Sequence, residues 1–387
     1  MFVFKKRIIN KLAARKETDL YREPVEIENR EGKFLLIEGG KVLNFASNDY
    51  LGLGVSEELK RKVSDNFLKY ATSSSSSRLV SGNYSVINQA EKEYARFFGY
   101  EDALFFPSGY QANTGILSAL FEKGDLLIFD KHMHAGSVKG MLLSGADFHG
   151  YKHNSMSHLC KWLEKTSEKK PAVLTESLFS MDGDFLDVQG FKGLKERFDF
   201  FSIVDEAHAF GATGENGKGI ARNVADIGVG TFGKALGLFG AFVLMPADFK
   251  EYFFNFSSPL IYTTTLPEAH AASAINILEI ISQCEKQRKH LSRISSLTKE
   301  KLVYEGFCVK GDAHILAVEI GDESVALEIS ERLLEEHIFV LPARYPTVPL
   351  HKAILRIGMT ALHTEEDVKK LVSTLKEVYG KIEKADR

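Results

Sequence analysis

Short apolar runs alternate with longer segments of helical period between about residue 100 and residue 245, and this alternation constrains the fold most. The runs are ALFF (103–106), LLIF (126–129), AVLT (172–175), FSIV (201–204) and GAFVL (240–244). Runs of this length between helical segments are typical of crossover units that build a mostly parallel sheet. We therefore predict an α/β fold in which ligands bind at the carboxyl ends of the strands.

The chain of 387 residues is longer than one simple domain, so we expect cooperating lobes with their own cores. We predict an N-terminal segment at 1–45, a large domain at 46–265 and a smaller C-terminal α+β domain at 266–387. In that last part we expect charged helices, a strand and a final amphipathic helix. They correspond to KQRKHLSRISSLTKEKL (286–302), ESVALEISERLLEEH (323–337), HILAVEIG (314–321) and a helix start near Thr364.

Composition excludes several classes of protein. Charged residues make up 26% of the chain and the net charge is -3, which indicates neither a disordered chain nor a general nucleic-acid binder. No stretch approaches the length of apolar chain that a membrane span requires. The basic residues 1–16 lack the apolar core of a secretory signal and predict a solvated helix. The protein is therefore expected in the cytoplasm, without membrane or nucleic-acid partners.

The cysteines give no metal signal. Cys160, Cys284 and Cys308 are far apart, and none of their spacings suits zinc. We expect inert thiols in a reducing compartment and no metal site.

Lys234 is the first candidate for chemistry. The segment GVGTFGKA (228–235) nearly matches the phosphate-loop pattern GxxxxGK[ST], but Ala235 replaces the hydroxyl residue that would bind Mg²⁺. Although most lysines are solvated charges, this one lies among small residues between two apolar segments. Desolvation there favours a neutral amine that can form an imine, and Thr231 could offer a hydroxyl to a phosphate or ring substituent.

Asp205 and His208 follow the predicted strand FSIV. A carboxylate at the end of a buried strand suits a protonated ring nitrogen, as a pyridoxal cofactor requires. His208 could reach the same cofactor from the following turn. Taken alone, Asp205 is more often a helix N-cap and a lone histidine is more often structural.

Further candidates follow other strands of the same sheet. Either His132 or His134 could stack on an aromatic cofactor, and the residues alone do not choose between them. Ser108, Gly109 and Tyr110 begin a helix whose free N–H groups suit a phosphate, although capping also explains them. Ser180 also follows a predicted strand and is a candidate cofactor contact, although the formation of a turn would explain this residue as well. Together these residues predict a pyridoxal 5'-phosphate enzyme that acts on amino acids.

The chain resembles the α-oxoamine synthases. The matching segments are SNDYLGL (47–53), PSGYQAN (107–113), TESLFSMDGD (175–184), VDEAHAFGATGENGKG (204–219) and TFGKALG (231–237). The resemblance implies a fold type I transferase dependent on pyridoxal 5'-phosphate, with a mostly parallel seven-stranded sheet in a large domain and a smaller C-terminal α+β domain. It also implies a homodimer with shared active sites, which condenses an amino acid with an acyl thioester and releases CO₂.

The resemblance assigns roles to individual residues. Lys234 becomes the imine lysine and the proton-transfer base, and Asp205 becomes the partner of the ring nitrogen. His134 becomes the residue that stacks on the cofactor ring, and His208 is a further catalytic residue. The remaining cofactor contacts are Gly109, Tyr110, Ser180, His208 and Thr231. The implied substrate contacts are Arg22, Asn48, Thr347 and Arg356, with Arg356 on the amino acid carboxylate.

Within the family, three segments are most similar to the branch that joins L-alanine to a pimeloyl thioester and makes 8-amino-7-oxononanoate for biotin. They are SSPLIYTTTLP (257–267), RYPTVP (344–349) and LRIGMTALH (355–363). The serine run Ser73–Ser77 and Asn88 depart from the pattern, which leaves open the acyl length and whether coenzyme A or an acyl carrier protein brings the acyl group. The alternatives are glycine C-acetyltransferase, 5-aminolevulinate synthase, serine palmitoyltransferase, an aminotransferase and a non-catalytic phosphate-binding protein.

Overall fold

The structure is a computed structural model that describes residues 2–385, and it divides into two compact units. The large unit is formed by Asn48–Ser180 and Phe185–Lys289. The small unit is formed by Met1–Ser47, Met181–Asp184 and His290–Arg387. The domain boundaries at residues 45 and 265 stay predictions.

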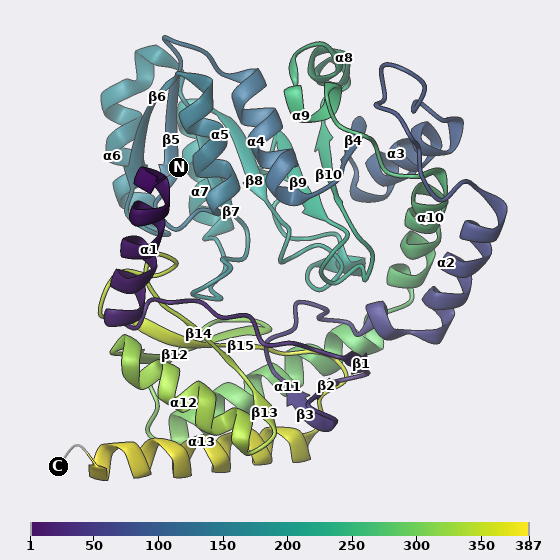
Figure 1. Cartoon of the computed structure of the whole chain (residues 1–387). Coiled ribbons are helices and arrows are strands. Elements are labelled where there is room, and N and C mark those ends of the chain that lie inside the picture. Colours follow the sequence, from purple (N-terminus) through teal and green to yellow (C-terminus); the bar gives the residue numbers. More distant parts are fainter. Residues whose placement is uncertain (1, 386–387) are drawn as a thin grey trace. The chain divides into compact units, whose positions relative to one another are not determined.

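A seven-stranded sheet forms the centre of the large unit (Figure 1), with the order β4-β10-β9-β8-β7-β5-β6. β10 is antiparallel to both β4 and β9, and the other neighbours are parallel. The predicted α/β class and mostly parallel seven-stranded sheet are therefore confirmed. The strands are β4 (Asp102–Phe106), β5 (Leu126–Asp130), β6 (Asp147–Tyr151), β7 (Ala172–Glu176), β8 (Phe201–Asp205), β9 (Ile227–Thr231) and β10 (Ala241–Met245).

The apolar runs of the sequence coincide with β4, β5, β7, β8 and β10, whereas β6 and β9 lack that signal. β6 (DFHGY) is a partly exposed edge strand, so it needs few apolar residues. β9 (IGVGT) carries glycines because its neighbours crowd it. A Cβ at Gly230 would lie 2.2 Å from the ring of Phe242. Close packing against neighbouring side chains, rather than strand propensity, therefore explains the glycines of β9.

Successive residues of the central strands face opposite sides of the sheet, and both sides are buried. Leu174 and Ile203 belong to one core cluster, whereas their neighbours Val173 and Val204 belong to the other. All four side chains are at most 2% exposed. This arrangement is typical of parallel strands covered by helices on both faces, and it explains why the runs read as continuously apolar.

Helices cover the sheet on its two faces, and α4 and α5 pack against each other (Figure 1). The helices of the large unit are α2 (Glu57–Lys69), α3 (Ser85–Phe98), α4 (Gly109–Leu120), α5 (Ala135–Ser144), α6 (Met156–Thr166), α7 (Val188–Phe198), α8 (Ala247–Phe256), α9 (Ser258–Ile261) and α10 (Glu268–Ser282).

The small unit contains two four-stranded sheets, ordered β1-β2-β3-β13 and β11-β12-β15-β14. The strands are β1 (Asn29–Glu31), β2 (Phe34–Ile37), β3 (Gly40–Asn44), β11 (Val309–Lys310), β12 (Ile315–Gly321), β13 (Ile338–Phe339), β14 (Leu341–Ala343) and β15 (Ala353–Gly358). Its helices are α1 (Phe2–Glu17), most of α11 (Glu285–Tyr304), α12 (Glu323–Glu335) and α13 (Glu365–Ala385). The charged helices, the strand and the last helix predicted for this region are confirmed.

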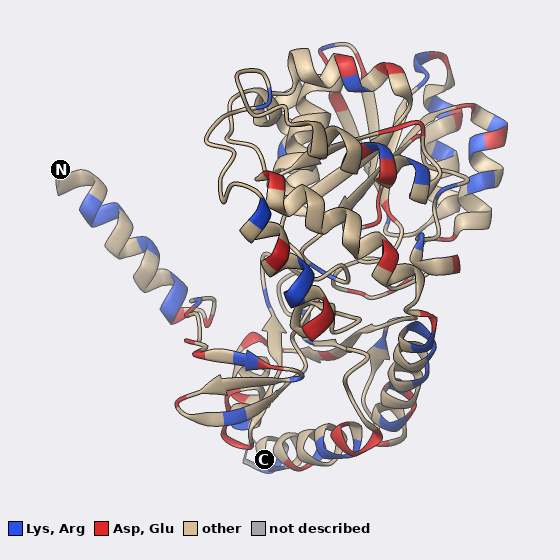
Figure 2. Cartoon of the chain, turned by 90° about the vertical axis from the view of Figure 1, so that its right-hand side faces the viewer, with Lys and Arg blue, Asp and Glu red and all other residues tan. Residues whose placement is uncertain are grey.

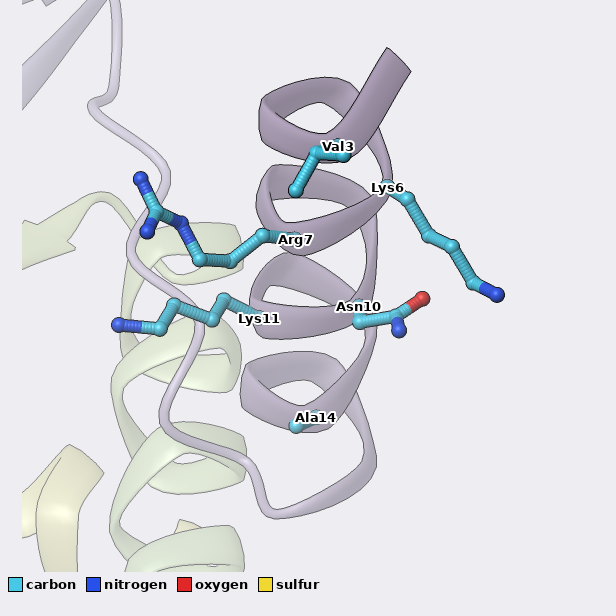
Figure 3. Close-up of a pocket in the computed structure, with 6 residues that line it drawn as sticks. All are labelled: Val3, Lys6, Arg7, Asn10, Lys11 and Ala14. Carbon is cyan, nitrogen blue, oxygen red and sulfur yellow. The ribbon is translucent and has the colours of Figure 1, made fainter.

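α1 is a solvent-exposed helix without a buried residue, as predicted. Lysine and arginine residues, blue in Figure 2, recur along it. Figure 3 shows a hollow whose lining residues all belong to α1. One exposed helix cannot enclose a small molecule, so we do not take this hollow as the active site. No helix within residues 2–385 is both long and apolar enough to cross a membrane.

Candidate active site

The carboxyl ends of neighbouring parallel strands bring polar side chains together in the large unit. β7 ends at Glu176, β8 at Asp205 and β9 at Thr231. Glu176 and Asp205 are register partners, and Asp205 pairs with Val229 on the other side. Because the crossover helices begin at this edge, their N-terminal N–H groups join the same region.

Lys234 lies at the end of a line of hydrogen bonds that runs into the core. Its Nζ is 2.7 Å from Nε2 of His208, whose Nδ1 is 2.6 Å from the hydroxyl of Tyr50. The Tyr50 hydroxyl donates to Oδ1 of Asn48 at 3.0 Å. His208 and Tyr50 are buried, whereas Lys234 is half-buried. The structure thus joins three predicted site residues through Tyr50, which we had not predicted.

Asp205 is a buried carboxylate held by neutral donors. Nδ2 of Asn113, on α4, donates to its Oδ2 at 2.8 Å, and the N–H of Ala207 donates to Oδ1 at 2.9 Å. Both donors fix the orientation of the carboxylate without neutralising it. Such a group suits a cationic ring nitrogen.

His134 is anchored by the buried carboxylate of Glu176. Its backbone N–H donates to Oε1 of Glu176 at 2.6 Å, and its Nδ1 accepts from the N–H of Gly136 at 3.1 Å as the N-cap of α5. The backbone of Ser180 also bonds Glu176. Partial burial lowers the pKa of His134, although Asp205 opposes this. Because the side chain also keeps an exposed surface, an uncharged ring is available to a ligand.

Burial and the charge of Asp205 raise the pKa of Glu176 to about 8, against the opposing charge of Lys234. Glu176 is 2% exposed. Burial therefore makes this carboxyl group easier to protonate than a solvated glutamate, while it holds the loop that carries His134.

His132 occupies different surroundings from His134. Its ring stacks on the ring of His153 with centroids 4.1 Å apart. Its backbone N–H donates to Oδ1 of Asp130 at 2.8 Å. Nδ1 of His153 lies 3.1 Å from the same carboxylate. These contacts favour His134 as the stacking residue, and that role stays a prediction.

The start of α4 has the properties of an anion site. Oγ of Ser108 accepts from the N–H of Gln111 at 3.2 Å, and the helix begins at Gly109. A Cβ built on Gly109 would meet nothing within 4 Å, and Tyr110 is 47% exposed. Thr231 has a structural contact, since its hydroxyl donates to the carbonyl of Gly240 at 2.9 Å.

The predicted substrate residues divide between the two units. Asn48 lies in the large unit beside Tyr50, and Arg22, Thr347 and Arg356 lie in the small unit. Nη2 of Arg22 donates to the Thr347 hydroxyl at 3.2 Å, so the fold joins two residues that are far apart in sequence. Arg356 lies on β15, paired with Ala317 of β12. The roles of these residues stay predictions.

The serine run, which departs from the family pattern, is followed along the chain by a buried arginine, Arg78, that bonds the other departure, Asn88. Arg78 bonds Glu91 at 2.6 Å, and both side chains are fully buried. Its Nη2 also donates to Oδ1 of Asn88 at 3.1 Å, and the hydroxyl of Ser74 donates to the carbonyl of Thr265 at 2.7 Å. The buried ion pair therefore ties this loop to the core of the large unit.

Sequence reasoning missed Tyr50, Asn113 and Glu176 as parts of the site. All three lie inside the segments that carry the family resemblance. Glu176 had the same signal as Asp205, an acidic residue that closes an apolar run. The partners of Tyr50 and Asn113 are distant in sequence, so no local pattern identifies them.

These residues fit a phosphorylated aromatic aldehyde such as pyridoxal 5'-phosphate. Lys234 offers an amine, Asp205 a buried carboxylate, His134 an uncharged ring and Gly109 an open helix N-terminus. The chemistry of this donor set matches what that cofactor requires.

Comparisons with known proteins agree with this fit. The model of the aminotransferase class I and II family matches residues 40–375. The 8-amino-7-oxononanoate synthase of Haemophilus ducreyi is 38% identical over 382 residues, which cover 94% of this chain and 98% of that protein.

Solved structures extend the likeness to the whole fold. The serine palmitoyltransferase of S. paucimobilis, solved with bound PLP and myriocin, has a TM-score of 0.88 at 25% identity and covers 96% of both chains. The 8-amino-7-oxononanoate synthase of Francisella tularensis has a TM-score of 0.76 at 29% identity, covering 87% of this chain and 97% of that one. The chain therefore belongs to the aminotransferase class I and II family, within its α-oxoamine synthase branch.

Proposed function

We propose that this protein condenses L-alanine with a pimeloyl thioester and releases CO₂ and the thiol carrier to give 8-amino-7-oxononanoate for biotin synthesis. The observation that carries the proposal is the similarity to 8-amino-7-oxononanoate synthases over nearly their whole length. The enzyme is an acyltransferase that depends on pyridoxal 5'-phosphate. When bound, this cofactor supplies an electron sink that makes the α-carbon of an amino acid nucleophilic.

The residues of the large unit divide the remaining tasks. Lys234 holds the cofactor and then moves the α-proton, with His208 in hydrogen-bond reach of its Nζ. Asp205 would keep the ring nitrogen of the cofactor protonated, and His134 would contact the ring. The N–H groups at Gly109 and Tyr110 bind the phosphate, and Ser180 and Thr231 add contacts.

Substrate binding falls to four further residues in this proposal. Arg356 holds the carboxylate of alanine, because a guanidinium matches carboxylate geometry. Arg22, Asn48 and Thr347 contact the substrates, and the hydrogen bond from Arg22 to Thr347 supports a shared task for these two. The acyl carrier is coenzyme A or an acyl carrier protein.

We also propose a cytoplasmic homodimer with shared active sites. The family resemblance supports the dimer. The three cysteines are all free and no two are paired, as is usual for a reducing compartment. Sedimentation analysis tests the dimer: a monomer that keeps full turnover would contradict it.

Product identification tests the function directly. The purified protein is incubated with alanine, glycine or serine and with pimeloyl or shorter thioesters, and products are identified by mass spectrometry. We expect 8-amino-7-oxononanoate from alanine and the pimeloyl thioester, and CO₂ in equal amount. Lys234→Ala should lose turnover and the visible absorbance of the cofactor-bound lysine. Retention of both in this variant would refute the role of Lys234.

A second candidate is a serine palmitoyltransferase type of reaction, favoured by the fold likeness to that enzyme. It predicts product from serine and a long-chain thioester. An aminotransferase would instead need a 2-oxo acid and no thioester. The same substrate panel separates all three activities.

A further inference from the structure

We infer that Tyr50 is a positioning residue that decides which nitrogen of His208 carries the proton, so that Nε2 of His208 faces Lys234 as an acceptor. A line of contacts joins Lys234, His208, Tyr50 and Asn48 at 2.7, 2.6 and 3.0 Å. Tyr50 is fully buried at 0% exposure. A buried hydroxyl in such a line has a defined hydrogen-bond direction, because an unpaired donor there is costly.

The direction follows from the number of hydrogens available. A phenol has one hydrogen to donate, and Tyr50 donates it to the side-chain amide oxygen Oδ1 of Asn48. The Tyr50 oxygen can therefore only accept from His208, which requires a hydrogen on Nδ1. In the neutral imidazole Nε2 is then bare, and it accepts a hydrogen bond from Nζ of Lys234.

The segment that carries Tyr50 is held rigidly enough for this task. The N–H of Tyr50 donates to the carbonyl of Asn48 at 2.9 Å, and the N–H of Gly54 donates to Oδ2 of Asp49 at 2.9 Å. These bonds fix the turn of SNDYLGL against the ring of His208. Asn48 therefore acts on His208 through Tyr50 rather than by contact.

This arrangement gives Lys234 an acceptor for its proton. Besides His208, Lys234 interacts electrostatically with Glu176 and His134, and Asp205 acts on both of these groups. A bare Nε2 on His208 favours the ammonium form of Lys234, because it accepts one of the ammonium hydrogens. Loss of the Tyr50 oxygen leaves Nδ1–H without its acceptor, which favours the opposite tautomer and turns an N–H toward Lys234. The neutral amine then becomes more favourable.

The mechanistic meaning of this inference rests on the proposed function, but the tautomer is a property of the cofactor-free chain. Nitrogen NMR of protein with labelled histidine reports it directly, and His208→Gln identifies the signal. We expect Nδ1–H in the wild type and a smaller share of that form in Tyr50→Phe. Nε2–H in the wild type, or an unchanged ratio in Tyr50→Phe, would overturn the inference whether or not the protein condenses alanine.

A second readout is the pH midpoint for binding of pyridoxal 5'-phosphate to Lys234, followed by visible absorbance. Tyr50→Phe should move this midpoint to lower pH by at least about half a unit. The matched control is Tyr94→Phe, because Tyr94 is equally buried and its hydroxyl donates to the carbonyl of Ala274 at 3.0 Å. The control should leave the midpoint unchanged, and equal shifts in both variants would reject a specific role.

Asn48→Leu keeps the test decisive if Tyr50→Phe does not fold. Without the Asn48 oxygen, the Tyr50 hydroxyl is free to donate to Nδ1 of His208. The tautomer and the midpoint should then move in the same direction as in Tyr50→Phe. No movement in Asn48→Leu would contradict the inference.

Discussion

The backbone N–H of His134 donates a 2.6 Å hydrogen bond to Oε1 of Glu176, a carboxylate from the neighbouring strand end. Glu176 also bonds the backbone of Ser180. A single buried group therefore positions two of the loops in which we predict cofactor contacts. Its own side chain needs no contact with the cofactor to affect the reaction.

Removal of this acceptor should misplace His134. We expect Glu176→Leu to lower kcat/KM by about 10²-fold, because small displacements of a catalytic group have effects of that size. Glu176→Gln keeps a carbonyl oxygen for the N–H of His134 and should retain most activity. The control is Glu206→Gln, a fully buried carboxylate whose Oε2 instead accepts from the N–H of Ile220 at 2.7 Å. A Leu variant as active as the Gln variant would show that the contact is dispensable.

Glu176 and Glu206 should each lose their contribution to the stability of the cofactor-free protein as pH rises from about 5 to about 8. Burial raises the pKa of Glu176 to about 8 and that of Glu206 to about 7, both from 4.5. In this window each of these two groups binds more protons in the folded state than in the unfolded state, so each contributes a slope of up to about -1.4 kcal/mol per pH unit. Urea unfolding at several pH values measures it. Glu206→Gln should remove the part of the slope that belongs to Glu206, and identical pH profiles in wild type and Glu206→Gln would disprove the assignment.

Asp205→Asn should reduce turnover by at least about 10²-fold, because a neutral amide cannot hold a ring nitrogen protonated. Asn113→Leu removes the 2.8 Å donor to Asp205 and should cause a smaller loss in the same parameter. Steady-state kinetics and the visible spectrum of the bound cofactor measure both effects. Wild-type kcat in Asp205→Asn would remove this residue from the proposed mechanism.

Arg356→Lys should raise KM for alanine by about tenfold, since a lysine cannot form the paired hydrogen bonds of a guanidinium. KM for the thioester should change less. Thr347→Val offers a comparison, because it removes only the 3.2 Å bond from Arg22. Equal effects of Arg356→Lys on both substrates would argue against a carboxylate-binding role.

The apolar runs of the sequence determined much of the fold. Strands buried on both faces need continuous apolar residues, so β4, β5, β7, β8 and β10 were predictable within about a residue. The same argument placed Asp205 and the start of α4 at the carboxyl edge, because parallel strands share that edge. β6 and β9 were not predictable in this way, since one lies at an exposed edge and the other is crowded by Phe242.

The sequence by itself also singled out Lys234, which lies among small residues, and Asp205, which closes an apolar run, but it left His132 and His134 as equal candidates. Only the tertiary structure decided how they are held. Asn48 and Tyr50 reach His208 across more than 150 residues of chain, and Asn113 reaches Asp205 across 92. Hydrogen bonds of this kind leave no periodic pattern in the sequence, since their geometry exists only once the sheet has brought the loops together.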